Sequence, residues 1–335
     1  MESVVTGSAR ATYKRCPKKW YWKYKLGLVP KAQIFGATDL GTWVHEALAL
    51  WYQANAKDRM RLSLVELFSG IAGSALEWAK RDGAPDEQLE KGEELSLLGE
   101  NMMQAYAYRY GNDASIHILA VEMPLQFEFP LGIHRLKPDA VYRDGNGDNW
   151  LLEHKTTQSI STEYLSLDDQ ARPYGSMAEL ALKKVGILKR TDTLRGIMYN
   201  FMRKGFMDER EYDSEGYALN KNGTRSKRQP APLLLRHPVF MSRKAKVITL
   251  KRVEREVMEL TSLTNRLRAG QMDPMWIPKT PNKACKRCEF FKMCVMEEEG
   301  GDITDMRKGM YVKRDPLSYY GDSDTIEESG DFDMG

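Results

Sequence analysis

One stretch, residues 136–157, constrains the fold more than any other because it has the pattern of a β-hairpin. Residues 136–142 and 150–156 are rich in β-branched and aromatic side chains, as strands usually are. The segment between them reads Asp-Gly-Asn-Gly-Asp, and its glycines supply the positive φ angles that tight turns need. The sequence therefore predicts two paired strands at the centre of a β-sheet.

The predicted hairpin carries three charged side chains that strand pairing brings together. Asp139 lies on the first predicted strand. Glu153 and Lys155 lie on the second, and they project from the same face because residues i and i+2 of a strand share one. Carboxylates bind Mg²⁺ or Mn²⁺, which polarises a phosphate and lowers the pKa of a bound water, while a lysine can stabilise developing charge. The pattern indicates phosphodiester hydrolysis, although strands with alternating charges on an exposed face are common.

The composition indicates a globular protein without a membrane segment. The chain has 335 residues, of which 42% are apolar, enough for the core of one large domain or two. It has no run of about 18 apolar residues and no apolar signal sequence at its N-terminus. Its four cysteines are too few for a disulfide scaffold. We therefore expect a cytoplasmic protein with no membrane partner.

Charge is unevenly distributed along the chain. Residues 315–335 contain seven of the 47 acidic residues and no lysine or arginine. Residues 1–314 therefore hold all 50 basic residues and 40 acidic ones, a net charge of +10. A basic body suits a polyanionic partner such as DNA. We expect residues 315–335 to be an acidic disordered tail, which either keeps the protein soluble or competes with nucleic acid for a basic groove.

The N-terminal part of the chain is predicted to be helical. Residues 8–30 form a short helix around Cys16, crowded with lysines and aromatic side chains. These rings either pack on the core or stack on the bases of single strands. The aromatic residues assigned to core packing are Tyr13, Trp20, Tyr21 and Tyr24. A second helix is predicted to start near Gly41, which places His45 in its first turn beside an apolar stripe.

Helices and strands alternate in the rest of the chain. Residues 60–110 are predicted to be helical, and residues 117–129 form a strand on which Glu122 either faces the site or is an ordinary strand acid. A further strand is expected at 193–201 and a further helix at 247–269. This alternation favours an α/β fold with a mixed central sheet flanked by helices.

A helix that begins with polar residues is predicted after the hairpin. Asp168 or Asp169 can cap a helix there. Gln170 and Tyr174 are four residues apart and share one face of that helix. Pro173 lacks a backbone donor, so the helix either starts later or is distorted.

A second candidate contact segment is the polar stretch 207–232. Its composition is typical of a mobile loop whose basic side chains either contact phosphates or are only solvated. These basic residues are Lys221, Arg225, Lys227 and Arg228.

All four cysteines fit a single metal site. Cys285, Cys288 and Cys294 form a C-x2-C-x5-C cluster, and Cys16 is the fourth cysteine of the chain. A zinc ribbon pairs two C-x-x-C motifs, which this one-plus-three arrangement does not. A [4Fe–4S] cluster accepts thiolates from scattered positions. We expect that cluster, with zinc as the less favoured occupant and four unrelated buried cysteines as the remaining alternative.

Together these motifs resemble the RecB-type branch of the PD-(D/E)xK nucleases, and within it the iron–sulfur members such as the AddB nuclease domain and the CRISPR-associated RecB-like exonucleases. The matching motifs span residues 13–294 and follow the family's order. They are the cysteine in Y-K-R-C-P-K-K-W-Y, G-x-x-x-H at Gly41 and His45, P-D at Pro138 and Asp139, E-H-K from Glu153 to Lys155, Q-x-x-x-Y at Gln170 and Tyr174, and the terminal cysteine triplet.

The resemblance implies a restriction-endonuclease-like core in a single domain of residues 1–314, with a helical insertion at about 57–112. It also assigns roles to individual residues. His45, Asp139, Glu153 and the backbone carbonyl of His154 would hold the metal, Lys155 would be the catalytic lysine, and Gln170 and Tyr174 would position the DNA strand. Cys16, Cys285, Cys288 and Cys294 would hold the cluster, which would staple the two ends of the domain together.

We therefore expect a Mg²⁺- or Mn²⁺-dependent deoxyribonuclease. The resemblance favours an exonuclease acting on single-stranded DNA or processed ends in recombination, repair or replication. The chain has no P-loop motif of its own, so a helicase or recombination protein is an expected partner. The alternatives are a non-catalytic DNA-end-binding protein on the same scaffold and a DNA-processing endonuclease.

Overall fold

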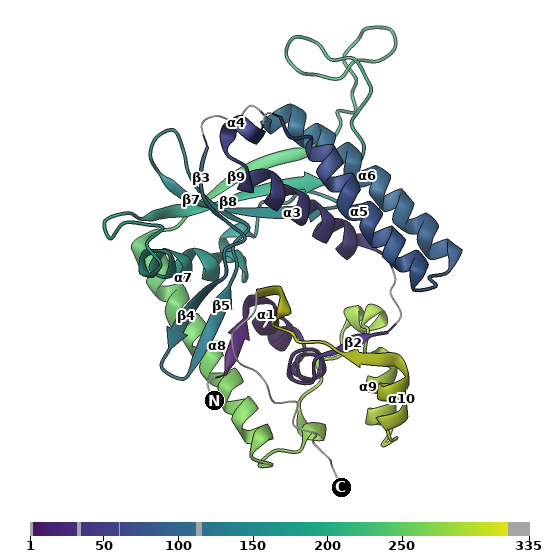
Figure 1. The fold of residues 1–335 in the computed structure, drawn as a ribbon, viewed down its shortest axis with the longest axis vertical. Helices are drawn as coiled ribbons and strands as arrows, with labels where there is room; N and C mark the ends of the chain where they lie inside the picture. The colour runs from purple at the N-terminus through teal and green to yellow at the C-terminus, as the bar shows by residue number, and fades with distance from the viewer. Residues whose placement is uncertain (1–2, 32–34, 60, 112–115, 321–335) are drawn as a thin grey trace.

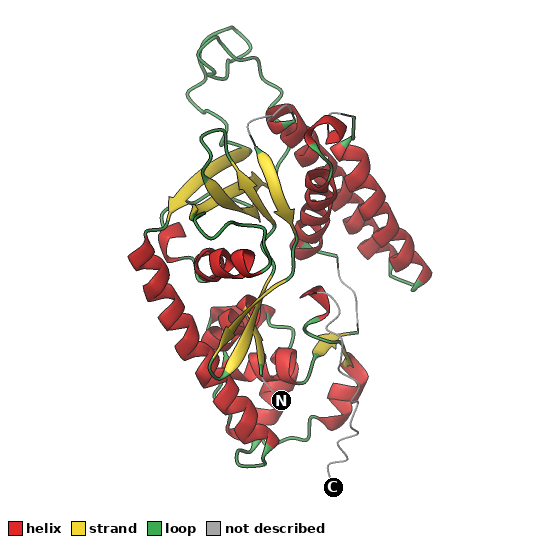
Figure 2. Cartoon of the chain, turned by 60° about the vertical axis from the view of Figure 1, so that its left-hand side comes forward, coloured by secondary structure: helices red, strands yellow, loops and turns green. Residues whose placement is uncertain are grey.

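The computed structural model describes residues 3–31, 35–59, 61–111 and 116–320. It is a mixed α/β structure in which helices flank the sheets, as the sequence predicts (Figures 1 and 2). None of the described helices is long and apolar enough to cross a membrane. Of the predicted acidic tail, residues 321–335 lie outside the described residues.

The central sheet has five strands in the order β3-β6-β7-β8-β9. These are β3 (His117–Val121), β6 (Ala140–Arg143), β7 (Asn149–Thr157), β8 (Leu194–Arg203) and β9 (Leu234–Phe240). The predicted hairpin is confirmed, since β6 and β7 pair antiparallel with Ala140 opposite Leu152. Because β7 and β8 run parallel, the sheet is mixed.

The other five described strands form two smaller sheets. A three-stranded sheet has the order β1-β5-β4, and β10 pairs antiparallel with β2. Their bounds are β1 (Val4–Thr6), β4 (Leu125–Phe129), β5 (Gly132–Leu136), β2 (Leu28–Pro30) and β10 (Tyr311–Lys313). Through β10 the C-terminal segment lies against the N-terminal part of the chain (Figure 1).

Two predicted strands are each divided between two sheets, which corrects the predicted boundaries. The stretch 117–129 breaks at residues 122–124 into β3 and β4, and the stretch 136–142 breaks at residues 137–139 between β5 and β6. Each break contains a proline, which cannot donate to a strand ladder. The breaks lie side by side, since the Glu122 backbone N–H donates to the Asp139 carbonyl at 3.0 Å.

One face of the central sheet is covered by three long helices (Figure 1). They are α3 (Ala37–Gln53), α5 (Leu64–Arg81) and α6 (Asp86–Tyr110), with the short α4 (Ala56–Arg59) between the first two. Trp43, Phe68 and Met103 from these helices are buried in one cluster with Trp150 and Leu152 of β7. The predicted helical insertion therefore forms a layer that packs on the sheet.

Helix α3 begins earlier than predicted. The Gly36 N–H donates to the Asp39 carboxylate at 2.9 Å, and the helix runs from Ala37 rather than from near Gly41. His45 consequently lies in the interior of the helix and not in its first turn.

The opposite face packs on α7 (Ala171–Lys184) and α8 (Arg243–Arg268). Leu151 of β7 is buried there with Met177 and Val253, so β7 is covered on both faces. Helix α1 (Gly7–Arg15) joins this layer. Its buried Arg10 forms an ion pair with Glu256 of α8.

The two ends of the chain meet in a third, smaller core. It is built from η1, the π-helical turn Tyr21–Lys25, from β2 and β10, and from α9 (Phe291–Glu298) and α10 (Thr304–Met310), and its buried residues are Trp22, Leu28, Phe290, Met293 and Tyr311. The remaining short elements of these two segments are α2 (Pro17–Trp20) and the 3₁₀ turns η3 (Pro274–Trp276), η4 (Lys283–Arg287) and η5 (Ser318–Tyr320). Buried Lys18 links the ends, since its Nζ lies 2.6 Å from Glu297. Trp20 is buried, and Tyr13, Tyr21 and Tyr24 are partly buried against the core, so the predicted core packing is confirmed. Base stacking by these rings stays a prediction.

The polar segment 207–232 extends away from the sheet between β8 and β9 (Figure 1). Isolated bridges join Tyr212 to Ala218 and Leu219 to Arg225, so the loop folds back on itself. Contact between its basic side chains and phosphates stays a prediction.

Candidate active site

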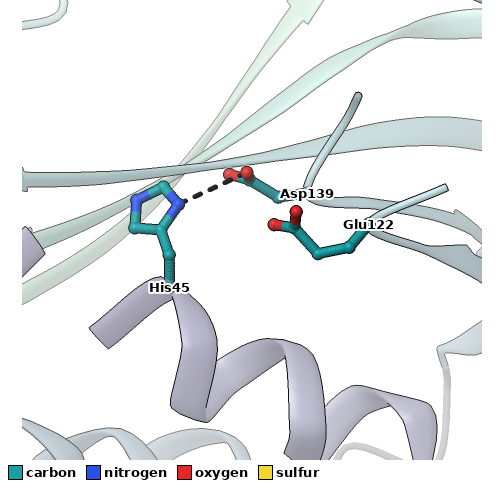
Figure 3. Close-up of side chains that lie close together, drawn as sticks. All are labelled: His45, Glu122 and Asp139. Carbon is teal, nitrogen blue, oxygen red and sulfur yellow. Dashed lines mark ion pairs between the residues drawn. The ribbon is translucent and has the colours of Figure 1, made fainter. Parts of the chain in front are cut away.

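Three potential metal ligands converge where the chain passes between the sheets. His45 comes from α3, Glu122 from the break after β3, and Asp139 from the break before β6 (Figure 3). One donor atom from each lies within 4.8 Å of the others. Nδ1 of His45 is 3.3 Å from Oδ1 of Asp139. The two strand breaks therefore place both carboxylates beside the histidine.

A glycine allows α3 to approach the sheet closely enough for this contact. A Cβ atom built on Gly41 would lie 3.1 Å from Oγ1 of Thr156 on β7, tighter than most such contacts. His45 follows one helical turn later on the same side of α3. The G-x-x-x-H spacing thus has a packing reason as well as a chemical one.

Asp139 is buried and held in one orientation. Its Oδ2 accepts a hydrogen bond from the His154 backbone N–H at 2.6 Å. Burial raises the pKa of Asp139, but its interactions with His45 and with that N–H outweigh burial and hold the pKa well below its ordinary value. In return, burial lowers the pKa of His45, and the Asp139 carboxylate more than offsets this and raises it to about 9. Without a bound cation, the pair therefore favours a carboxylate beside a protonated imidazole, and a cation bound to His45 would displace that proton.

Glu153 and Lys155 form an ion pair beside this cluster. Nζ of Lys155 lies 2.8 Å from Oε1 of Glu153. Burial raises the pKa of Glu153 to about 7, against the attraction of Lys155. Burial lowers the pKa of Lys155, but the Glu153 carboxylate outweighs it and the pKa lies above its ordinary value. Lys155 thus keeps its charge in a buried setting.

The side chain of His154 is used for packing. Its ring stacks on Tyr52, and its Nδ1 lies 2.7 Å from Nδ2 of Asn200. Burial lowers the pKa of His154 to about 3, so the ring is neutral. These contacts fix the backbone of β7 at the residue between Glu153 and Lys155, whose carbonyl is the predicted fourth ligand.

Gln170 and Tyr174 line the same cavity as the charged residues. The cavity has a volume of about 420 Å³, and His45, Asp139 and Glu153 also line it. The predicted N-cap at Asp168 or Asp169 is wrong by position, because α7 has Gln170 as its N-cap residue; Oδ1 of Asp168 accepts from the backbone N–H groups of Gln170 and Ala171 just before the helix. Pro173, expected to delay or distort the helix, lies in the first turn of α7, where backbone N–H groups have no hydrogen-bond partner within the helix, so its missing N–H costs no helical hydrogen bond. The helix is therefore undistorted at Tyr174.

A second cavity, of about 860 Å³, adjoins the first. His45, Lys137 and Tyr319 line both cavities, so the two meet at the metal-ligand cluster. The second cavity continues past Thr42 of α3 to Lys204. Together they form a long depression with the charged residues in its middle.

The sequence analysis missed two residues of this site, Lys137 and Tyr319, and left a third, Glu122, open between a site-facing acid and an ordinary strand acid. The proline two residues after Glu122 signals that its strand ends there. Lys137 precedes Pro138 at the second break and lies 2.9 Å from Glu122. Tyr319 reaches the site from the C-terminal segment, and no local pattern could have indicated it.

The four cysteines come from two segments that are far apart in the sequence. Cys16 joins α1 to α2, Cys285 lies in η4, and Cys288 and Cys294 border the small core. Burial raises the pKa of both Cys288 and Cys294, and Cys16 adds to this effect. Among the described residues, no three sulfurs lie within 4.8 Å of one another. The predicted cluster therefore stays a prediction.

Three comparisons with known proteins test the predicted nuclease family. A search of curated protein sequences gives no match. A solved structure described as "Crystal structure of SSO0001" is similar at 12% identity over 76% of this chain and 84% of that one, with a TM-score of 0.27, and so weak a likeness carries no argument. The sequence profile of the PD-(D/E)XK nuclease superfamily matches residues 5–295. With most of its length matched, the chain belongs to the PD-(D/E)XK nuclease superfamily.

Proposed function

We propose that the protein is a Mg²⁺- or Mn²⁺-dependent deoxyribonuclease of the RecB type. The observation that carries the proposal is that His45, Asp139 and Glu153 line one cavity, with the Lys155 ammonium paired to Glu153 and both carboxylates buried. A structural ion pair would need only two of them. The family supplies the nuclease class, and the basic body of the chain suits a DNA substrate.

The donor set fits a hard divalent cation. Asp139, Glu153, the His154 carbonyl and the His45 imidazole would hold Mg²⁺ or Mn²⁺, which prefer oxygen ligands and accept a histidine. Glu122 offers a further carboxylate within reach of His45 and Asp139. When bound, the cation polarises a phosphate and lowers the pKa of a water molecule.

Residues of the chain would position the reacting groups around the cation. Lys155, held by Glu153, orients the attacking water or stabilises charge that develops on the phosphate. Gln170 and Tyr174, at the start of α7, position the DNA strand in the cavity. The His154 backbone N–H holds the Asp139 carboxylate in the orientation in which it would bind the cation.

We assign exonuclease action on single-stranded DNA or processed ends, in recombination, repair or replication, with a helicase or recombination protein as partner. The iron–sulfur members that the motifs resemble support this assignment. The test is degradation of end-labelled linear DNA with Mg²⁺ or Mn²⁺ and with a chelator. Loss of label as mononucleotides or short products, abolished by chelation, is expected. DNA that stays intact with either cation contradicts the proposal.

We also assign a [4Fe–4S] cluster to Cys16, Cys285, Cys288 and Cys294. What supports the cluster over zinc is the likeness of the cysteine motifs to those of the iron–sulfur members, since a [4Fe–4S] cluster accepts thiolates from scattered positions and a zinc ribbon pairs two C-x-x-C motifs. Bound to these thiolates the cluster would have a structural role, because it joins α2 to α9.

A further inference from the structure

Tyr319 of the C-terminal turn η5 reaches a residue 197 positions earlier. Its hydroxyl donates a hydrogen bond to Oε2 of Glu122 at 3.1 Å. Nζ of Lys137 lies 2.9 Å from the same oxygen. Lys137 also donates to the Tyr319 carbonyl at 3.2 Å and lies 4.0 Å from the centre of its ring. The three side chains thus form a closed set of contacts around one carboxylate.

Both contacts use the same oxygen of Glu122. A carboxylate oxygen of Glu122 also lies within 4.8 Å of the donor atoms of His45 and Asp139. The backbone of Glu122 has φ +47°, a conformation that only a few per cent of non-glycine residues adopt. A strained ligand of this kind needs its surroundings to hold it in place.

The turn that carries Tyr319 is fixed to the body of the protein. The Arg314 N–H donates to the Gly27 carbonyl at 2.8 Å, directly after β10 pairs with β2. Gly27 has φ +66°, and a Cβ there would lie 2.4 Å from the Arg314 carbonyl oxygen, so only glycine fits. Next to Tyr319, Tyr320 is buried, with its hydroxyl 3.5 Å from that of Tyr174.

We infer that Tyr319 is a positioning residue for the metal site: together with Lys137 it fixes Glu122 so that the other carboxylate oxygen completes the cation site of His45 and Asp139. The C-terminal turn is then part of the catalytic centre, not a solubilising tail. This inference rests on the proposed metal dependence. The alternative is that the turn with Tyr319 blocks access of the cation to the site, and the two alternatives predict opposite changes in Mn²⁺ affinity.

The test is Mn²⁺ binding to the full-length protein without DNA, followed by electron paramagnetic resonance of the free ion. Tyr319→Phe removes only the hydroxyl, and the half-exposed ring keeps its contact with Lys137. Loss of such an outer hydrogen bond should weaken Mn²⁺ binding by about 10-fold. Tyr108→Phe, at an exposed tyrosine of α6, is the matched control and should bind like wild type. Lys137→Met should weaken binding in the same direction.

Three outcomes would overturn the inference, and they have different meanings. If Tyr319→Phe binds Mn²⁺ as tightly as wild type, Glu122 needs no positioning. Tighter binding by Tyr319→Phe, or by a chain that ends at Arg314, means that the turn obstructs the site. If wild type itself binds no Mn²⁺, the proposed metal dependence fails and the inference fails with it.

Discussion

Nζ of Lys155 lies 2.8 Å from Oε1 of Glu153, two residues earlier on the same buried face of β7. The pairing keeps Lys155 charged and holds it next to the candidate metal ligands. A partly buried lysine held by a neighbouring carboxylate is well placed to stabilise charge on a reacting phosphate.

The first prediction concerns that lysine. Lys155→Met should lower the rate of DNA cleavage by at least about 100-fold, because a charged group at the reacting phosphate is lost. DNA binding, measured by gel shift, should change little. Lys184→Met is the matched control, since Lys184 is exposed on α7 and pairs only with Glu128. Cleavage by Lys155→Met at the wild-type rate would remove this residue from the mechanism.

The second prediction concerns the ion pair between α1 and α8. The Arg10 guanidinium is buried, and its Nε donates to Oε2 of Glu256 at 2.7 Å. Glu256→Gln removes the nearer of the two carboxylates that pair with Arg10 and leaves only Asp169, whose Oδ1 lies 3.5 Å from Nη2 of Arg10, so the free energy of unfolding in urea should fall by about 3 kcal/mol. Glu259→Gln, on the same helix at an exposed pair with Arg255, should change it by no more than about 0.5 kcal/mol. Equal effects of the two variants would show that burial of Arg10 is unimportant.

The third prediction concerns stability against pH. His134 of β5 is fully buried, and burial together with the charge of Arg10 lowers its pKa to about 3. The unfolded chain therefore takes up a proton near pH 6.5 that the folded protein does not accept until about pH 3. Above pH 6.5 His134 is neutral in both states and does not lower the stability. As the pH falls from 6.5 to about 3, only the unfolded chain is protonated there, and the free energy of unfolding falls by at most about 1.4 kcal/mol per pH unit.

The measurement is urea unfolding between pH 7 and 5. His134→Leu should flatten the pH dependence of the free energy of unfolding relative to wild type. His117→Asn, at an exposed histidine of β3, should leave the wild-type slope in place. An unchanged slope in His134→Leu would assign the pH dependence to other groups.

The fourth prediction concerns the cysteines. Purified protein should be brown and contain iron and acid-labile sulfide in equal amounts. Cys16→Ser should lose both, and its unfolding temperature should fall because the link between the chain ends is gone. A colourless wild-type protein loaded with zinc would contradict the cluster.

Much of the site could be predicted because its motifs are local. The turn composition at 144–148 predicts the β6–β7 hairpin, and the spacing of Glu153 and Lys155 places them on one face of β7. Gln170 and Tyr174 follow from a capped helix start. Each of these inferences depends on residues within a few positions of one another.

The rest of the site depends on contacts between distant segments. Alternating apolar residues continue through 117–129, so periodicity alone does not show that Glu122 ends a strand and turns toward Asp139. The prolines at 124 and 138 mark these breaks, but they do not show that the breaks are adjacent. Tyr319 reaches Glu122 only because β10 pairs with β2, a pairing that its short strands do not reveal.

The most direct test of metal-dependent DNA cleavage at this site compares end-labelled linear with covalently closed circular single-stranded DNA. Wild type, Glu153→Ala and Lys155→Ala are incubated with each substrate in Mg²⁺ or Mn²⁺. We predict that wild type shortens linear DNA, that circles survive, and that both variants are inactive. Cleavage of the circles would make the enzyme an endonuclease acting at the same site. Wild-type protein that binds DNA ends and cuts neither substrate with either metal would contradict the central claim and leave an end-binding protein.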